Sequence, residues 1–393
     1  MGSDEITAIR MSYELNSGYW KVADRCFFNK LDCLLFATKI KNDRVTYHFF
    51  DEIYTNINWK EDPVQSLSSM YADRARKIRE KYKYVSILFS GGADSTNVLK
   101  SFIDNNIHID EIISFSPIQA SNKLLGTFDR TNRSANNQVF EYYETVVPMF
   151  EFLKKYHPNI KLTVIDYTNE IISLIDTSNI HKLFLSGCTL HTNITGFYLA
   201  YRHVAKHDSS CVVLGIDKPR VLYDKTQGIF KSYFYDYNTM HGHFPKETFN
   251  GDQPGTEYFY YDHETPYIPV KQCKQILEYL TPILNPTHPL HSRVLLDRSH
   301  SFIVNMHDDY VKKLIYPTWN TSLFQADKNY SHFYHEIGAW MNDTTLTSSK
   351  MKDFYDGQLR ELVSGVDPKF MQVDQNNKPH KFVEIYTKKI PLQ

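Results

Sequence analysis

The residues best suited to chemistry lie in one short stretch, Ser90-Gly91-Gly92-Ala93-Asp94-Ser95, which directly follows an apolar, β-branched run at 85–89. Glycines adopt backbone angles that other residues avoid, and they let a ligand approach the main chain. Main-chain N–H groups that converge where a strand turns into a helix favour a bound anion. Asp94 would repel a bare phosphate, so its presence indicates a cation between the two. The stretch therefore predicts a phosphate–magnesium site at a strand-to-helix turn, with Ser90 and Ser95 as added hydroxyl donors.

Two other interpretations of this stretch are weaker. An ordinary turn of an α/β protein accounts for two glycines, but not for the whole string directly after a buried-type strand. The Walker pattern is absent because no Gly-Lys-Ser/Thr follows. A dinucleotide fingerprint would need three spaced glycines, and only Gly91 and Gly92 are present here.

The Ser90–Ser95 string resembles the PP-loop of the N-type ATP pyrophosphatases. That superfamily includes asparagine synthetase, β-lactam synthetase, GMP synthetase, NAD synthetase and tRNA-thiolating enzymes. The resemblance implies an adenine nucleotide α-hydrolase-like (HUP) fold, with ATP and Mg²⁺ as cofactors. It also implies cleavage of ATP between the α and β phosphates and adenylation of a substrate oxygen.

Two features make the resemblance closest to the asparagine-synthase-like synthetase domain. Ala93, at the variable position of the motif, is similar to the amide-forming branches rather than to the Lys-bearing thiolating ones. An Arg-rich segment precedes the motif and Ile109-Asp110-Glu111-Ile112-Ile113-Ser114 follows it, a phrasing similar to that of proteins encoded by tailed phages.

The surrounding pattern predicts the elements that must position this loop. A strand at 84–89, a helix at 95–105 and a strand at 110–116 form a β-α-β unit, and further strands are expected at 162–167 and 211–217. Such crossovers build a parallel sheet, and ligands bind beyond the carboxyl ends of its strands. Ser114 and Phe115 lie at the second such end, where the resemblance implies contact with the adenine. Core packing is the competing interpretation of Phe115.

The fourth predicted strand runs into Gly215-Ile216-Asp217-Lys218-Pro219-Arg220. The resemblance implies that Gly215 contacts the nucleotide and that Asp217 binds metal together with Asp94. The loop departs from the asparagine-synthetase pattern because the second glycine and the acidic pair are missing. Lys218 and Arg220 place cations there, which indicates a substrate, or a substrate charge, other than aspartate. These two and Lys328 are the candidates to stabilise charge during catalysis, although an exposed structural role is the alternative for Lys328.

Length and composition set the wider expectations. The 393 residues suggest a small N-terminal β or α+β segment (1–62), an ATP-binding α/β domain (63–240) and a mostly helical C-terminal substrate lobe (241–393). A net charge of −1 does not indicate nucleic acid as the main partner. The five cysteines form no Cys-x-x-Cys pair, which is typical of a reduced compartment. With no membrane-length apolar run, we expect a cytoplasmic protein, in the host cytoplasm if it is phage-encoded.

The sequence therefore predicts an ATP-dependent, AMP-forming ligase without its own glutaminase domain. It would adenylate a substrate oxygen, most simply the carboxylate of an amino acid or a nucleotide-like molecule, and transfer it to an amine or ammonia. Two alternatives stay open: a PP-loop enzyme that modifies nucleic acid or nucleosides, and an ATP-binding module without turnover. The amine donor, a separate glutaminase partner and a homodimer are also left open.

Overall fold

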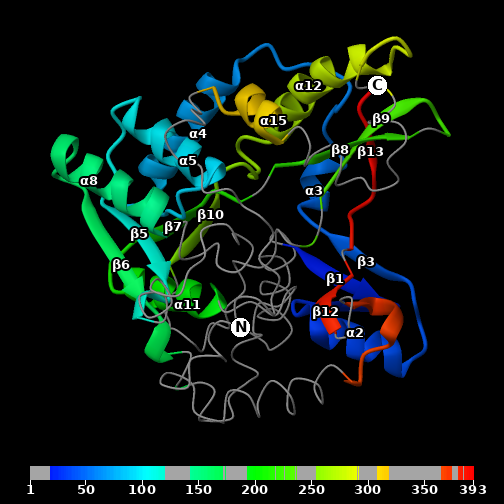
Figure 1. Cartoon of the computed structure of the whole chain (residues 1–393), viewed down its shortest axis with the longest axis horizontal. Coiled ribbons are helices and arrows are strands. Elements are labelled where there is room, and N and C mark those ends of the chain that lie inside the picture. Colours follow the sequence, from blue (N-terminus) through cyan, green and yellow to red (C-terminus); the bar gives the residue numbers. More distant parts are fainter. Residues whose placement is uncertain are drawn as a thin grey trace, which may run out of the picture.

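A five-stranded parallel sheet lies at the centre of the chain (Figure 1). Its strands are β4 (Tyr84–Leu88), β5 (Glu111–Ser116), β6 (Lys161–Asp166), β7 (Ser210–Leu214) and β10 (Gly255–Tyr258). The computed structural model describes residues 18–119, 142–170, 173, 193–216, 218–224, 226–234, 236, 254–289, 291, 308–317, 364–373, 379–383 and 385–393. The predicted α/β class with a parallel sheet is confirmed.

The strand order, β10-β7-β4-β5-β6, places the first strand of the sheet in its middle. The chain runs outward from β4 through β5 to β6, then returns to the other side of β4 to form β7 and finally β10. Strand order therefore reverses between β4 and β7. In open α/β sheets, the crevice at such a switch point, outside the carboxyl ends of the strands, is where ligands bind. The Ser90–Ser95 loop follows β4 and so lies at this point.

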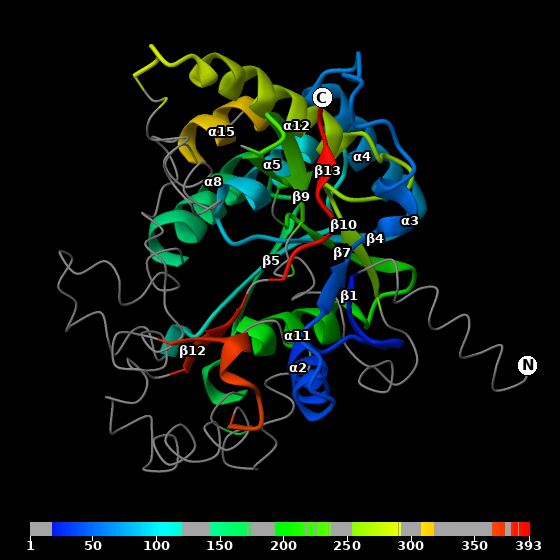
Figure 2. The same ribbon diagram turned by 90° about the vertical axis from the view of Figure 1, so that its right-hand side faces the viewer.

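Helices cover both faces of the sheet. In Figure 2, α4, α5, α12 and α15 lie above the sheet, while α11 lies below it. The helices are α4 (Leu67–Lys81), α5 (Ala93–Ile103), α8 (Val147–Tyr156), α11 (Asn193–Val204), α12 (Ile268–Leu280) and α15 (Asp308–Ile315). A π-helical turn, Tyr142–Val146, precedes α8, and a 3-10 turn, Thr281–Leu284, follows α12. None of the helices in the described ranges is long and apolar enough to cross a membrane.

A serine caps the start of α4. The helix begins at Leu67, after Pro63. Ser66 is its N-cap, and the Ser66 hydroxyl accepts a hydrogen bond from the Ser69 N–H at 3.3 Å. A serine side chain satisfies one of the free N–H groups of the first turn, which proline cannot do.

Smaller sheets surround the central one. The N-terminal sheet has the order β2-β1-β3, with strands β1 (Tyr19–Val22), β2 (Arg25–Phe27) and β3 (Val45–His48). Helix α2 (Lys30–Lys39) packs against all three strands, and α3 (Asp51–Tyr54) follows β3. Another sheet has the order β13-β9-β8 and a third pairs β11 with β12: β8 (Arg220–Asp224), β9 (Ile229–Tyr233), β11 (Met371–Val373), β12 (Pro379–Phe382) and β13 (Ile390–Pro391), with a 3-10 turn at Pro368–Phe370. Within 241–393, predicted to be mostly helical, the described residues thus contribute β10 to the central sheet and three further short strands.

Aromatic rings join the N-terminal segment to the rest of the core. Phe49 packs against Phe234 and Tyr261, with ring centroids 5.4 and 5.0 Å apart. A buried ion pair lies in the same region, with Lys30 Nζ 2.5 Å from Asp236 Oδ2. The Trp20 indole donates to the same Asp236 oxygen at 2.9 Å. The N-terminal segment is therefore held against the rest of the core by polar contacts with Asp236 as well as by aromatic packing.

Candidate functional site: the loop that follows strand β4

Gly91 holds the loop in a conformation that a side chain would prevent. Its φ is +81°, a left-handed value that favours glycine. A Cβ at this position would also lie 2.0 Å from Oγ1 of Thr145, a buried residue of the π-helical turn before α8. The loop therefore needs glycine at this position for two separate reasons, the backbone angle and the close approach of Thr145.

The two serines of the loop bond to each other and to the loop main chain. The N–H of Ser90 donates to Ser95 Oγ at 3.3 Å, and the N–H of Gly92 donates to Ser90 Oγ at 3.3 Å. The Ser95 hydroxyl donates to the Gly92 carbonyl at 3.2 Å. These bonds shape the turn from within, because Gly92 is the N-cap of α5 and supplies no capping side chain.

The main-chain N–H groups at the start of α5 precede the first hydrogen bond of that helix. The first helical hydrogen bond runs from the Thr96 N–H to the Gly92 carbonyl, at 2.9 Å. Among the described residues, none accepts from the N–H groups of Ala93, Asp94 or Ser95. The first N–H groups of a helix have no partner inside the helix, and together with the helix dipole they attract anions. The start of α5 can therefore donate several hydrogen bonds to a phosphate.

Neighbouring strand ends flank the loop. Leu88 lies opposite Ile113 of β5 and Leu214 of β7, so Ser114 and Gly215 come next to the point where the loop leaves β4. A Cβ on Gly215 would lie 3.0 Å from both the carbonyl oxygen of Asp94 and the Cα of Ser95. The structure thus brings Gly215, Ser114 and the loop to one edge of the sheet, as the sequence predicted.

Asp94 is half-buried and is contacted by two tyrosines from distant parts of the chain. The Tyr316 hydroxyl donates to Asp94 Oδ1, and the Tyr260 hydroxyl donates to the main-chain carbonyl of Asp94 at 2.8 Å. Burial, followed by the charge of Asp94, raises the pKa of both phenols well above its ordinary value. Both phenols therefore remain protonated donors. Within the described ranges, no group donates to Asp94 Oδ2.

Ser114 and Phe115 occupy different environments at the end of β5. Ser114 is buried. The half-buried Phe115 ring packs edge-on against Phe197 at a centroid distance of 4.7 Å and stacks so closely on Gly196 that a Cβ there would lie 2.3 Å from the ring. These contacts are what the core-packing interpretation of Phe115 requires, and its predicted adenine contact stays a prediction.

The described residues include two of the three cations predicted at the site, but not the second predicted metal-binding carboxylate. Lys218 is buried, and Arg220 is the first residue of β8, directly opposite Tyr233 of β9. Asp217 and Lys328 lie outside the described residues. Among the described residues, no group of three or more His, Cys, Asp or Glu side chains could hold a metal ion. Asp94 is thus the described carboxylate available at the loop.

Several residues at this edge were not found by sequence reasoning. Thr145, Tyr260 and Tyr316 contact the loop, but no local pattern marks them. Two buried hydroxyls, Thr96 Oγ1 on α5 and Ser116 Oγ at the end of β5, have no hydrogen-bond partner in the described parts of the chain. Buried polar groups are normally paired, so these hydroxyls are candidates to bond a ligand.

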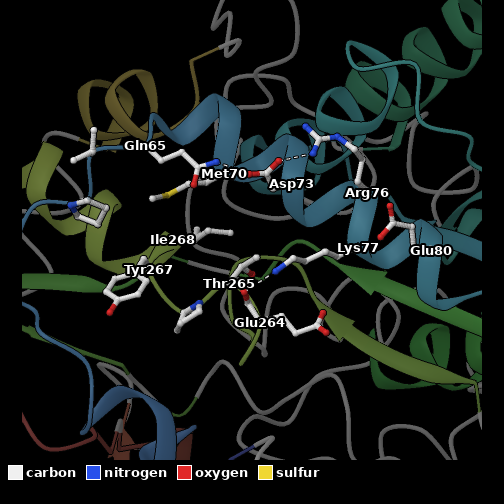
Figure 3. A pocket seen from close by; sticks show the side chains of 13 residues that line it. Gln65, Met70, Asp73, Arg76, Lys77, Glu80, Glu264, Thr265, Tyr267 and Ile268 are labelled. Atoms are coloured by element: carbon white, nitrogen blue, oxygen red, sulfur yellow. Dashed lines mark hydrogen bonds and ion pairs between the residues drawn. The ribbon is translucent and has the colours of Figure 1, made fainter.

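A cavity of about 440 Å³ lies elsewhere, between the outer side of α4 and the start of α12 (Figure 3). Lys77 donates to the Glu264 carbonyl there at 2.8 Å, and Arg76 pairs with Asp73 at 2.5 Å. The lining residues are Pro63, Val64, Gln65, Met70, Asp73, Arg76, Lys77, Glu80, Glu264, Thr265, Pro266, Tyr267 and Ile268. None of the predicted site residues is among them.

Comparison of this sequence with protein-family models and with curated proteins gives no match. The geometry at the end of β4 and the residues that form it are therefore the basis for a proposed function.

Proposed function

We propose that this protein is an ATP-dependent, AMP-forming ligase that binds the triphosphate of ATP on the Ser90–Ser95 loop. One observation carries the proposal. A glycine turn lies at the carboxyl end of β4, where the strand order reverses, and the main-chain N–H groups that follow it have no acceptor among the described residues. This is the place in an open α/β sheet where a nucleotide is expected, and these N–H groups are suited to its phosphates.

The loop residues fit a Mg²⁺–triphosphate in three ways. Gly91 allows the left-handed turn of the loop against Thr145, and Gly215 lets the end of β7 pack closely against the loop main chain, so the two glycines set the shape of the loop. The N–H groups of 93–95 supply donors, and Asp94 Oδ2 supplies a carboxylate oxygen, the ligand type that Mg²⁺ prefers. When bound, Mg²⁺ would neutralise phosphate charge. In this proposal Asp217 is its second protein ligand.

The work of the protein in this reaction is positioning and electrostatic stabilisation. A substrate oxygen, most simply a carboxylate, attacks the α-phosphate of ATP, and pyrophosphate leaves. An amine or ammonia then displaces AMP. No nucleophilic side chain is required. Lys218, Arg220 and Lys328 are the residues proposed to stabilise the developing charge, and the substrate is proposed to be a small molecule such as an amino acid or a nucleotide-like acid.

The test is pyrophosphate release by the full chain, with ATP, Mg²⁺, an amine donor and panels of amino acids, nucleotides and RNA. Asp94→Asn should abolish most of the release. Asp73→Asn removes a carboxylate from the neighbouring helix α4, where it pairs with exposed Arg76, and should leave release unchanged. ATP binding without release on any acceptor would instead favour the binding module. Release that depends on RNA would favour the nucleic-acid-modifying alternative.

A further inference from the structure

We infer that Tyr316 is a positioning residue for the nucleotide site: it holds Oδ1 of Asp94 and leaves Oδ2 available for the divalent cation that accompanies the triphosphate. This inference rests on the proposed function. Its basis is the hydrogen bond from the Tyr316 hydroxyl to Asp94 Oδ1, which joins residues 222 positions apart in the chain. An aspartate side chain is free to rotate unless one of its oxygens is held, and a partner on Oδ1 fixes the direction of Oδ2.

Tyr316 can fix this direction because it is itself held firmly. It directly follows α15 and is fully buried. The carbonyl of the preceding residue, Ile315, accepts a hydrogen bond from the Tyr71 hydroxyl of α4 at 2.7 Å. Gln272 of α12 donates to that same hydroxyl at 2.9 Å. A chain of hydrogen bonds thus runs from α12 through α4 to the end of α15, and the next residue in the chain, Tyr316, donates to the carboxylate of the loop.

The chemistry of a tyrosine suits this role better than that of a cationic side chain. A lysine or arginine beside Asp94 would cancel its charge and compete with a bound cation. A phenol donates one hydrogen bond and leaves the carboxylate negatively charged. Tyr260 provides a useful contrast, because its ring lies 5.7 Å from that of Tyr316 but its hydroxyl bonds to the main-chain carbonyl of Asp94. Tyr316 therefore holds the side chain of Asp94, whereas Tyr260 holds the main chain of the loop.

The experiment measures binding of α,β-methylene-ATP to the full chain as Mg²⁺ is varied, in the wild type, Tyr316→Phe, Tyr260→Phe, Asp94→Asn and the double variant of residues 94 and 316. Loss of a hydrogen bond to a charged group commonly changes an equilibrium on the order of tenfold. We therefore expect Tyr316→Phe to raise the Mg²⁺ concentration needed for half-maximal nucleotide binding about tenfold. In the Asp94→Asn background, Tyr316→Phe should add no further shift, because the carboxylate it acts through is gone.

The matched control is Tyr260→Phe, which removes an equally buried phenol hydroxyl beside the same loop. Because Tyr260 bonds the main chain of the loop and not the carboxylate, Tyr260→Phe should weaken nucleotide binding at every Mg²⁺ concentration and leave the half-maximal Mg²⁺ concentration near that of the wild type. Equal Mg²⁺ shifts in the two variants, or additive shifts in the double variant, would overturn the inference about Tyr316 alone. Failure of the wild type to bind the nucleotide at all would instead overturn the proposed function.

Discussion

Two carboxylates, Glu257 and Asp94, lie in contrasting environments at the central sheet. Glu257, on β10, is buried, and each of its oxygens is paired. Arg74 reaches Oε2 at 2.6 Å, while Lys81 and Tyr82 donate to Oε1 at 2.8 and 2.6 Å. Asp94 is half-buried and has one side-chain partner among the described residues, Tyr316.

The contrast distinguishes a carboxylate that stabilises the fold, Glu257, from one that is suited to bind a ligand, Asp94. Arg74 also pairs with Asp262 at 3.0 Å, while its Nε has no hydrogen-bond partner among the described residues. Both oxygens of Glu257 are nevertheless paired by protein groups, so this carboxylate leaves nothing for a ligand to complete, whereas a partly satisfied one lowers stability unless a ligand completes it. Oδ2 of Asp94, to which no described group donates a hydrogen bond, is therefore the feature that makes the loop the candidate site.

The first prediction concerns Arg74→Met, which removes the buried cation that Asp262 and Oε2 of Glu257 share, while Lys81 still pairs with Oε1 of Glu257. Removing one partner of a buried ion pair commonly costs about 3–5 kcal/mol. We expect a loss of that order in the free energy of unfolding, measured by urea denaturation. Arg76→Ala, on the same helix, breaks an exposed pair with Asp73 and should cost about 0–1 kcal/mol. Similar losses in the two variants would show that the Glu257 network does not hold the fold.

The second prediction concerns the backbone of the loop, where Gly91→Ala should be destabilising. A left-handed residue other than glycine costs roughly 1–2 kcal/mol. The overlap with Thr145 adds to this cost. Gly92→Ala is the matched control, because Gly92 has a φ of −71° that alanine also adopts. Equal thermal stability of the two variants would contradict the close approach of Thr145 to the loop.

The elements that sequence reasoning could predict are those whose pattern is local. The β4–α5–β5 unit was predicted because an apolar run, two glycines and a helical segment follow one another directly. β10 was missed because Gly255–Tyr258 is short and begins with glycine. It becomes a strand only by pairing with β7, more than forty positions earlier in the chain.

For the candidate site, too, the sequence predicted the residues that local pattern and strand order place, but not those that come from distant parts of the chain. The loop residues and Gly215 come together as expected, since the ends of adjacent parallel strands meet at one edge. The contacts of Tyr260 and Tyr316 with Asp94 join residues 166 and 222 positions apart. No spacing rule relates such residues, because the tertiary fold alone brings them together.

The third prediction concerns the loss of stability at low pH, where Glu257 becomes protonated and its ion pairs are weakened. Burial would raise the pKa of Glu257, but the charge of Arg74 and the hydrogen bonds from Lys81 and Tyr82 outweigh it and lower the pKa below the ordinary 4.5. The folded chain then binds fewer protons than the unfolded chain in this range, so the contribution of Glu257 is fully present above about pH 4.5 and is lost as pH falls through the lowered pKa. Urea unfolding between pH 7 and pH 3 should show this loss, with a shallower decline in Glu257→Gln. An unchanged slope in Glu257→Gln would contradict the prediction.

The smallest expected effect comes from the same chemical change at the other carboxylate, Asp94→Asn. The amide of the introduced asparagine would keep an oxygen that can accept from Tyr316, so the main loss is the favourable interaction of a negative charge with the first turn of α5, worth about 0.3–1 kcal/mol. Glu257→Gln should cost several times more, because it leaves Arg74 buried beside a neutral amide. In nucleotide binding the order should reverse: Asp94→Asn weakens Mg²⁺-dependent ATP binding and Glu257→Gln does not. An equal loss of stability in both variants, with ATP binding unaffected in both, would remove the distinction between a structural and a ligand-binding carboxylate.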